Sequence, residues 1–205
     1  MNISEAAELI RIDKISGVHS QTPRPQTWCD LGCGTGTFTL ALATLLPAGS
    51  VIHAIDKDEK SLSQIPDHYH EVTIRKQVAT LSASNLSLPS LDGVLMANLL
   101  HYIEDQGAFT AKLRTLSERL LVVEYDKRAQ SQWIPYPIGF SALRGLLLEQ
   151  GFTEIVRIGT RGSRYAGELY SAWAESQSEQ SQKFAAPGSH HPALQEQLGS
   201  VLRRA

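Results

Sequence analysis

Residues 27–46 read Thr-Trp-Cys-Asp-Leu-Gly-Cys-Gly-Thr-Gly-Thr-Phe-Thr-Leu-Ala-Leu-Ala-Thr-Leu-Leu, with three glycines between two apolar segments. The first segment, residues 27–31, is short, apolar and followed by glycine, which is typical of a buried strand. The second segment favours a helix that either Thr35 or Thr37 can cap and that Pro47 ends. The stretch therefore predicts a strand, a sharp glycine turn and a helix.

The three glycines of this turn permit backbone angles that side chains forbid, and they let a ligand lie directly on the backbone. The start of the following helix adds free N–H groups and a partial positive charge. The spacing is G-x-G-x-G rather than the dinucleotide fingerprint G-x-G-x-x-G, and Asp30 precedes the first glycine by two positions. A carboxylate there suits a cation and disfavours a pyrophosphate. The turn therefore favours S-adenosylmethionine over a dinucleotide, with an ordinary glycine-rich turn as the alternative.

Composition bounds the class of protein. The chain has 205 residues, of which 42% are hydrophobic and 20% charged, which suits one globular domain. A net charge of −2 without a dense basic run argues against a nucleic-acid substrate. Apolar runs are too short for a membrane span, and no signal peptide is evident. The two cysteines, Cys29 and Cys33, are too few for a structural zinc site. We expect a soluble cytoplasmic protein with reduced cysteines and no metal.

A second apolar segment, residues 51–55, predicts the next strand, which ends at Asp56. An acidic side chain at this place in a βαβ unit can accept hydrogen bonds from both hydroxyls of a ribose. Asp56 can instead cap a helix over residues 58–65, a role that Asp58 fills equally well. The glycine turn upstream favours the ribose role.

The fourth strand, residues 91–98, is apolar enough to be central in a parallel sheet. Ligands of doubly wound sheets bind beyond the carboxyl ends of such strands, so Asn98, His101 and Tyr102 are candidates for the pocket. His101 can act as a general base, because the imidazole pKa lies near neutrality, or it can simply shape the pocket.

The remaining elements follow from apolar spacing, caps and glycine signals. Helices are predicted over residues 3–16, with Ser4 as the cap, over 105–117 and over 140–150. Strands are predicted over residues 70–78, 119–125, 152–159 and 167–174. The last two must be antiparallel, because only a short link joins them. The N-terminal helix either covers one mouth of the ligand site or packs on the sheet edge. His68 and His70 are interpreted as surface residues.

Two segments lie outside this alternation. The connection over residues 126–139 is too long for a plain turn, and its Trp133 and Tyr136 either line an apolar substrate site or pin the loop down. From residue 176 the composition becomes rich in Ser, Gln and Glu, which predicts a flexible tail over 176–205 with a short helix at 192–204. The globular domain is accordingly expected to span residues 1–175.

Over residues 27–174 the chain resembles the class I S-adenosylmethionine-dependent methyltransferases. The resemblance rests on the turn Asp30-Leu-Gly-Cys-Gly-Thr-Gly36 and on Leu91-Asp-Gly-Val-Leu-Met-Ala-Asn-Leu-Leu-His101, which looks like the fourth-strand motif of the small-molecule branch. The runs 121–126 and 164–170 look similar to an uncharacterised bacterial subgroup. The resemblance implies an α/β, doubly wound, seven-stranded and mostly parallel sheet with an antiparallel C-terminal hairpin, which is the Rossmann-like methyltransferase fold.

The resemblance also implies roles for particular residues. The glycine turn would contact the methionine end of S-adenosylmethionine, Asp56 the ribose, and Asn98 and Leu99 the sulfonium. The family often has an acid after the third strand that binds the adenine amino group, whereas this chain has Val78 and Ala79 there. The full cofactor-binding set is Asp30, Gly32, Cys33, Gly34, Thr35, Gly36, Asp56, Lys57, Val78, Ala79, Asn98 and Leu99. His101 and Tyr102 are the catalytic candidates.

The expected activity is transfer of a methyl group to the O, N or C atom of a small molecule, which needs mainly alignment of the nucleophile, methyl group and sulfur. Asn98-Leu-Leu-His lacks the Asn/Asp-Pro-Pro-aromatic motif of nucleic-acid amino-methylating enzymes. One alternative is an NAD(P)-dependent oxidoreductase, which would want glycine at Thr37 and a Tyr and Lys four residues apart. A second is a binding or scaffold protein whose cofactor site has decayed, with Val78 as its best support.

Overall fold

The computed structural model describes residues 1–11, 24–80, 88–126, 129–163 and 167–176. Within them the strands are β1 (Thr27–Leu31), β2 (Val51–Asp56), β3 (His68–Tyr69), β4 (Val72–Val78), β5 (Gly93–Ala97), β6 (Arg119–Asp126), β7 (Glu154–Gly162) and β8 (Glu168–Glu175). The helices are α1 (Ile3–Leu9), α2 (Thr37–Ala43), α3 (Glu59–Leu62), α4 (Gln106–Leu116) and α5 (Phe140–Glu149), with a short 3₁₀ turn, η2 (Leu100–Tyr102).

All these strands form one sheet in the order β3-β4-β2-β1-β5-β6-β8-β7. The five strands from β4 to β6 run parallel, and β8 pairs antiparallel with both β6 and β7. The chain order reverses between β1 and β5, whose carboxyl ends lie side by side in register Leu31 to Met96. This switch point is where ligands of doubly wound sheets bind.

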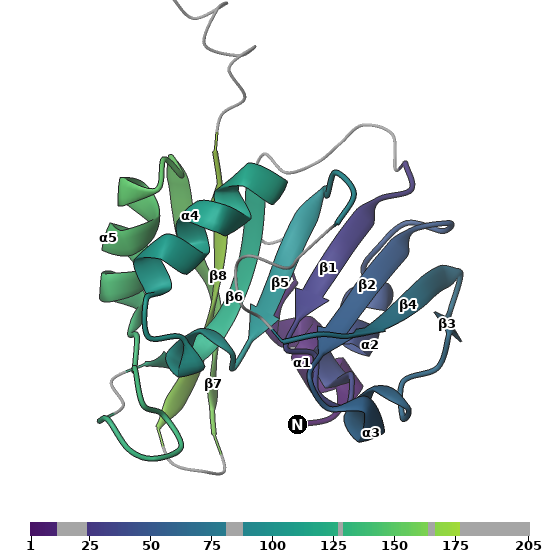
Figure 1. Cartoon of the computed structure of the whole chain (residues 1–205), viewed down its shortest axis with the longest axis horizontal. Coiled ribbons are helices and arrows are strands. Elements are labelled where there is room, and N and C mark those ends of the chain that lie inside the picture. Colours follow the sequence, from purple (N-terminus) through teal and green to yellow (C-terminus); the bar gives the residue numbers. More distant parts are fainter. Residues whose placement is uncertain (12–23, 81–87, 127–128, 164–166, 177–205) are drawn as a thin grey trace, which may run out of the picture.

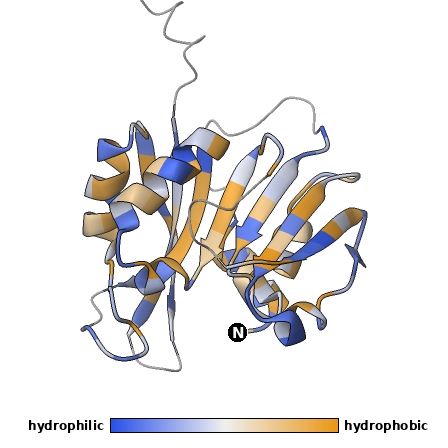
Figure 2. Ribbon diagram, in the orientation of Figure 1, coloured by the Kyte–Doolittle hydropathy of each residue, from blue (hydrophilic) through white to orange (hydrophobic). Residues whose placement is uncertain are grey.

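Helices cover both faces of the sheet (Figure 1). On one face of the sheet, α1 and α2 pack on Trp28, Leu95 and Leu121. On the other face, α4 and α5 pack on the side chains that alternate with these along the strands, such as Val94 and Leu120. Burial on both faces explains why the central strands read as continuous apolar runs, and Figure 2 shows apolar residues along β5 and β6.

The seven strands predicted from the sequence are confirmed, and β3 adds an eighth at the edge next to β4. His68 belongs to β3 rather than to a loop, and His70 lies between β3 and β4 with φ of 49° rather than in the third strand. Both histidines are exposed, as expected. The link over residues 160–165, which the sequence predicts to be a turn, is shorter than expected: residues 160–162 belong to β7, and residues 164–166 lie outside the described residues.

The residues that cap α1 and α2 differ from the predicted ones. The cap of α1 is Asn2 rather than Ser4, because Asn2 and Glu5 form a reciprocal capping box. Neither Thr35 nor Thr37 caps α2: Gly36 occupies that position in a left-handed conformation without a side-chain bond. Asp58 caps α3, which spans less than the predicted 58–65, so Asp56 is free of that role.

The predicted N-terminal helix and the predicted tail are described only in part. Helix α1 is described only as far as Leu9, and residues 12–16 of the predicted helix lie outside the described residues, as does the tail from residue 177. In the described parts of the chain, no helix is long and apolar enough to cross a membrane.

Candidate cofactor and active site

The glycine turn between β1 and α2 has the backbone geometry expected of it. Gly32, Gly34 and Gly36 have φ of 69°, 54° and 85°. A Cβ on Gly36 would lie 2.7 Å from Cγ1 of Ile65, so this position requires glycine on two grounds. A Cβ on Gly34 would meet nothing within 4 Å. The turn is therefore packed at Gly36 and open at Gly34, where a ligand can lie against the backbone.

Three backbone N–H groups of the turn donate to the end of β2. The Gly32 and Cys33 amides donate to the Ile55 carbonyl at 2.8 and 3.1 Å. The Gly34 amide donates to Oδ2 of Asp56 at 2.8 Å, and Oδ1 of Asp56 accepts from the Asp58 amide at 2.9 Å. Asp56 thus fixes the turn while its remaining lone pairs face the cavity that it lines.

Asp30 is buried beneath the turn. Its Oδ2 accepts a hydrogen bond of 2.6 Å from the Thr39 hydroxyl, while its Oδ1 has no partner among the described residues. Burial raises the pKa of Asp30 from 3.8 to about 7; the Thr39 bond opposes this shift, and the charge of Asp56 adds to it. A buried carboxyl with a spare oxygen suits a nearby cation, because the cation would compensate the charge that burial disfavours.

The carboxyl end of β5 brings Asn98 and Leu99 next to the turn. Asn98 adopts φ of 55°, which asparagine tolerates better than most residues, and its Oδ1 is buried without a partner among the described residues. Leu99 approaches the turn closely, since a Cβ on Gly32 would lie 2.7 Å from its Cδ1. The residues predicted from β1, β2 and β5 are therefore assembled at one edge of the sheet.

Two cavities meet at Asn98. One has a volume of about 600 Å³, and its walls carry most of the nucleoside-side candidates: Gly32, Asp56, Lys57, Thr80, Asn98, Leu99, Tyr102, Ile103, Gln132 and Trp133. The other has a volume of about 460 Å³ and lies on the side of α1 and β7, with Cys33, Gly34, Thr35, Tyr125 and the ion pair of Glu5 with Arg161 on its walls. We call them the nucleoside-side and the α1-side cavity.

Helix α1 fits both of its predicted roles. It packs on α2 and β7, where the Ser171 hydroxyl donates to the Leu9 carbonyl at 2.5 Å. Through Glu5 it also walls the α1-side cavity. Cys33 lines the same cavity with a free thiol, whose pKa burial raises above its usual range, so it is a poor nucleophile.

The predicted adenine-side residues lie at the end of β4. Val78, Ala79, Lys57 and Thr80 line a third, smaller hollow, and the Val78 side chain is exposed. Among the described residues, no carboxylate lines this hollow. Val78 and Ala79 offer a base an apolar surface here, next to Lys57 and Thr80.

His101 lines none of the three hollows described above. Its imidazole is 3% exposed, and its Nδ1 lies 2.7 Å from Oε2 of Glu124, which is itself buried on β6. The other oxygen of Glu124 accepts from the His101 amide at 3.2 Å. The imidazole packs against the rings of Tyr102 and Tyr125, which line the nucleoside-side and the α1-side cavity respectively.

We expect Glu124→Ala to lower the free energy of unfolding by about 3 kcal/mol, because it leaves the buried His101 side chain and amide without their acceptor. Glu124→Gln, which keeps the shape and one acceptor oxygen, should lose less. Urea unfolding measures both. The exposed Glu104→Ala serves as the control and should change stability by less than ~0.5 kcal/mol. A Glu124→Ala value equal to that of the control would show that the pair does not stabilise the fold.

Sequence reasoning missed Glu124, Thr39 and the pair of Glu5 with Arg161. A signal for Glu124 was present, since a glutamate inside the apolar run Leu121-Val-Val-Glu-Tyr125 requires a buried partner. The partner itself could not be read from the sequence, because β5 and β6 meet only in the folded sheet. Within the described residues, no cluster of three potential metal ligands occurs.

The part of the chain that carries this site is similar to a known protein family. Residues 29–119 match the family model described as "Methyltransferase domain". The matched range begins in β1, includes the glycine turn, Asp56 and Asn98, and ends at the start of β6. No curated protein matches the chain.

Solved structures share the fold. Magnesium protoporphyrin IX methyltransferase from Synechocystis PCC 6803 with bound SAM is 20% identical, with a TM-score of 0.60, 85% of this chain covered and 78% of that one. A SAM-dependent methyltransferase from Aquifex aeolicus is 16% identical, with a TM-score of 0.55 and coverage of 85% and 98%. The CurJ carbon methyltransferase is 16% identical, with a TM-score of 0.67, and the match covers 86% of this chain and 55% of that one. At these identities the likeness concerns the fold.

Proposed function

We propose that this chain is a class I S-adenosylmethionine-dependent methyltransferase, which moves the methyl group of that cofactor to a small-molecule nucleophile by in-line displacement. The observation that carries the proposal is the convergence of the matched residues: Asp30, Asp56 and Asn98 come from three strands and surround one glycine turn. The oxidoreductase and scaffold alternatives draw no support from the comparisons.

The site fits the proposed cofactor. The open space at Gly34 accepts the methionine portion, and the unpartnered oxygens of Asp30 and Asn98 suit its positive charges. Asp56 lines the nucleoside-side cavity as an acceptor for ribose hydroxyls, with Leu99 and Lys57 on the same walls. Val78 and Ala79 offer the base an apolar surface. We assign the whole predicted set of cofactor residues to these roles.

The residues of the chain have a limited chemical task. The sulfonium of the cofactor supplies an activated methyl group, so the protein must align the nucleophile and exclude water. Asn98 lies on the walls of both cavities, which supports a role for it beside the reacting atoms.

We propose that His101 accepts the proton of a hydroxyl or amine acceptor, with Tyr102 at the cavity wall helping to position that acceptor. Donation from Nδ1–H to Glu124 would leave Nε2 as the basic atom. The rings of Tyr102 and Tyr125 pack against the imidazole, so they must move aside when the acceptor binds for His101 to reach it.

A small-molecule acceptor is supported by the limited size of the two cavities, about 460 and 600 Å³, which must hold the cofactor and the acceptor together. We propose a cytoplasmic location, supported by the two free cysteines. We also propose that nucleic acid is not the substrate, because the chain carries a net charge of −2.

Calorimetric titration with S-adenosylhomocysteine, with NADH as the control ligand, tests the proposal. We expect saturable heat with S-adenosylhomocysteine and none with NADH. Heat with NADH alone would favour the oxidoreductase, and no heat with either ligand would favour a protein without a working cofactor site.

A further inference from the structure

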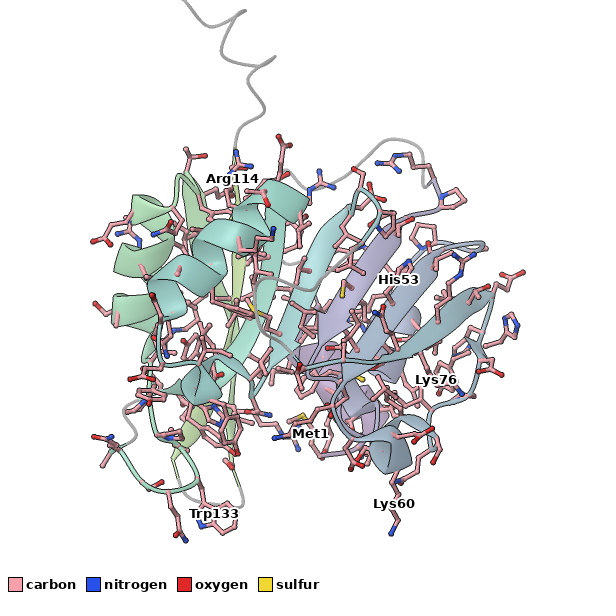
Figure 3. The ribbon with its side chains drawn as sticks, viewed as in Figure 1. Met1, His53, Lys60, Lys76, Arg114 and Trp133 are labelled. Atoms are coloured by element: carbon pink, nitrogen blue, oxygen red, sulfur yellow. The ribbon has the colours of Figure 1, made fainter. Side chains whose placement is uncertain are left out.

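Exposed apolar side chains gather at the edge of the sheet that carries the site. Among the described residues, the exposed large hydrophobic side chains are Met1, Val78, Tyr102, Trp133 and Leu148. All but Leu148 line one of the three hollows at the carboxyl ends of the strands. Figure 3 shows Met1 and Trp133 at this end and Arg114 at the opposite one. Exposed apolar surface rimmed by polar residues marks a binding site.

Trp133 is the most exposed of them, at 70%, yet its backbone is fixed. Ser131 and Ile134 exchange two backbone hydrogen bonds of 3.0 and 3.1 Å around it, and the Ile134 side chain is buried. The Tyr136 amide donates to the His101 carbonyl at 2.9 Å, which ties the segment to η2. The tight turn therefore presents the indole at the cavity rather than burying it.

The walls of the nucleoside-side cavity indicate what the indole meets. Asp56 lines this cavity together with Trp133 and Tyr102. A base is bonded directly to its ribose, so a ribose held by Asp56 brings the base to the place where this cavity and the hollow at Val78 share Lys57 and Thr80 on their walls. Among the described residues on these walls, Trp133 and Tyr102 offer aromatic faces and Leu99 and Ile103 apolar ones, which suit the planar face of a base.

Resting on the proposed function, we infer that Trp133 forms an aromatic wall that holds the adenine ring of the cofactor. Stacking of a base on an aromatic side chain is tolerant of the hydrogen-bonding pattern of that base, so it can stand in for a carboxylate at Val78.

The three tryptophans make the test direct. Trp28 and Trp173 are buried and their rings lie 6.3 Å apart, so Trp133 alone is accessible to a soluble quencher such as acrylamide. The experiment follows tryptophan emission and acrylamide quenching of the wild-type protein during titration with S-adenosylhomocysteine and, separately, with adenosine. Calorimetry in parallel gives the affinity of wild type, Trp133→Ala, Trp133→Phe and the control Leu148→Ala.

We expect both ligands to change Trp133 emission and to protect it from acrylamide. Trp133→Ala should bind S-adenosylhomocysteine about tenfold more weakly. Trp133→Phe should lose much less affinity, and Leu148→Ala, outside the cavities, should match wild type.

The outcomes separate the inference from the proposed function. Full-strength binding to Trp133→Ala, with wild-type emission unchanged on saturation, would overturn the inference alone and assign the wall to the methyl acceptor. Absence of binding to the wild type would overturn the proposed function and the inference with it.

Discussion

Asp56→Ala is expected to weaken binding of S-adenosylhomocysteine by about 100-fold or more. Two hydrogen bonds from ribose hydroxyls to a carboxylate, each worth ~1.5–3 kcal/mol, account for a loss of that size. The substitution also frees the Gly34 amide, which Oδ2 of Asp56 holds at 2.8 Å, so the glycine turn loses its anchor on β2. The substitution therefore removes the contacts to the ribose and also loosens the glycine turn.

Calorimetry measures the affinity, and Asp58→Ala is the matched control. Asp58 lies two residues away, caps α3 through the Lys60 amide and does not line the nucleoside-side cavity. Loss of this cap should cost ~1 kcal/mol of stability with little effect on affinity. Equal weakening by both substitutions would mean that the local structure, and not the Asp56 carboxylate, determines binding.

The wild type is expected to lose about 2–3 kcal/mol of its free energy of unfolding between pH 5 and pH 8 through Asp30, and Asp30→Asn is expected to abolish this loss. The pKa of Asp30 is about 7 in the folded chain, against 3.8 for an ordinary aspartate. Between these values the folded state keeps a proton that the unfolded state has lost. The stability contributed by the protonated carboxyl is therefore full at low pH and is lost as the pH rises toward 7.

Urea unfolding of the ligand-free protein across this range tests the expectation. The wild type should lose stability relative to Asp30→Asn as the pH rises, because asparagine does not titrate. The exposed Glu104→Gln controls for the removal of a carboxyl and should follow the wild-type profile. Parallel profiles for wild type and Asp30→Asn would show that Asp30 ionises normally in the folded chain.

The order of elements could be predicted because its signals are local. Apolar runs, glycines and prolines sit next to one another in the sequence, and the seven strands that they indicate are present in the structure. The cap of α1 also has a local signal, because Asn2 and Glu5 are three residues apart, but the predicted cap is Ser4. The edge strand β3 has only two residues and lacks a readable pattern.

The site was predicted in part for the same reason. The glycine turn and Asp56 follow from spacing, but the bonds from the turn to Ile55 and Asp56 join residues that are adjacent only in the folded sheet. The pairing of His101 with Glu124 joins η2 to β6, and it shows that the histidine side chain is buried and hydrogen-bonded rather than exposed to a ligand. Exposure of Trp133 depends on the turn at Ser131 and Ile134.

Anchoring of the glycine turn on β2 also bears on the thermodynamics of ligand capture. Three successive amides, from Gly32 to Gly34, are bonded within the chain before any ligand arrives. A binding loop already held in one conformation loses little conformational entropy when it is occupied, so more of the contact energy appears as affinity. We therefore expect the backbone of residues 32–36 to be superimposable in free and liganded protein, with any ordering on binding confined to other segments.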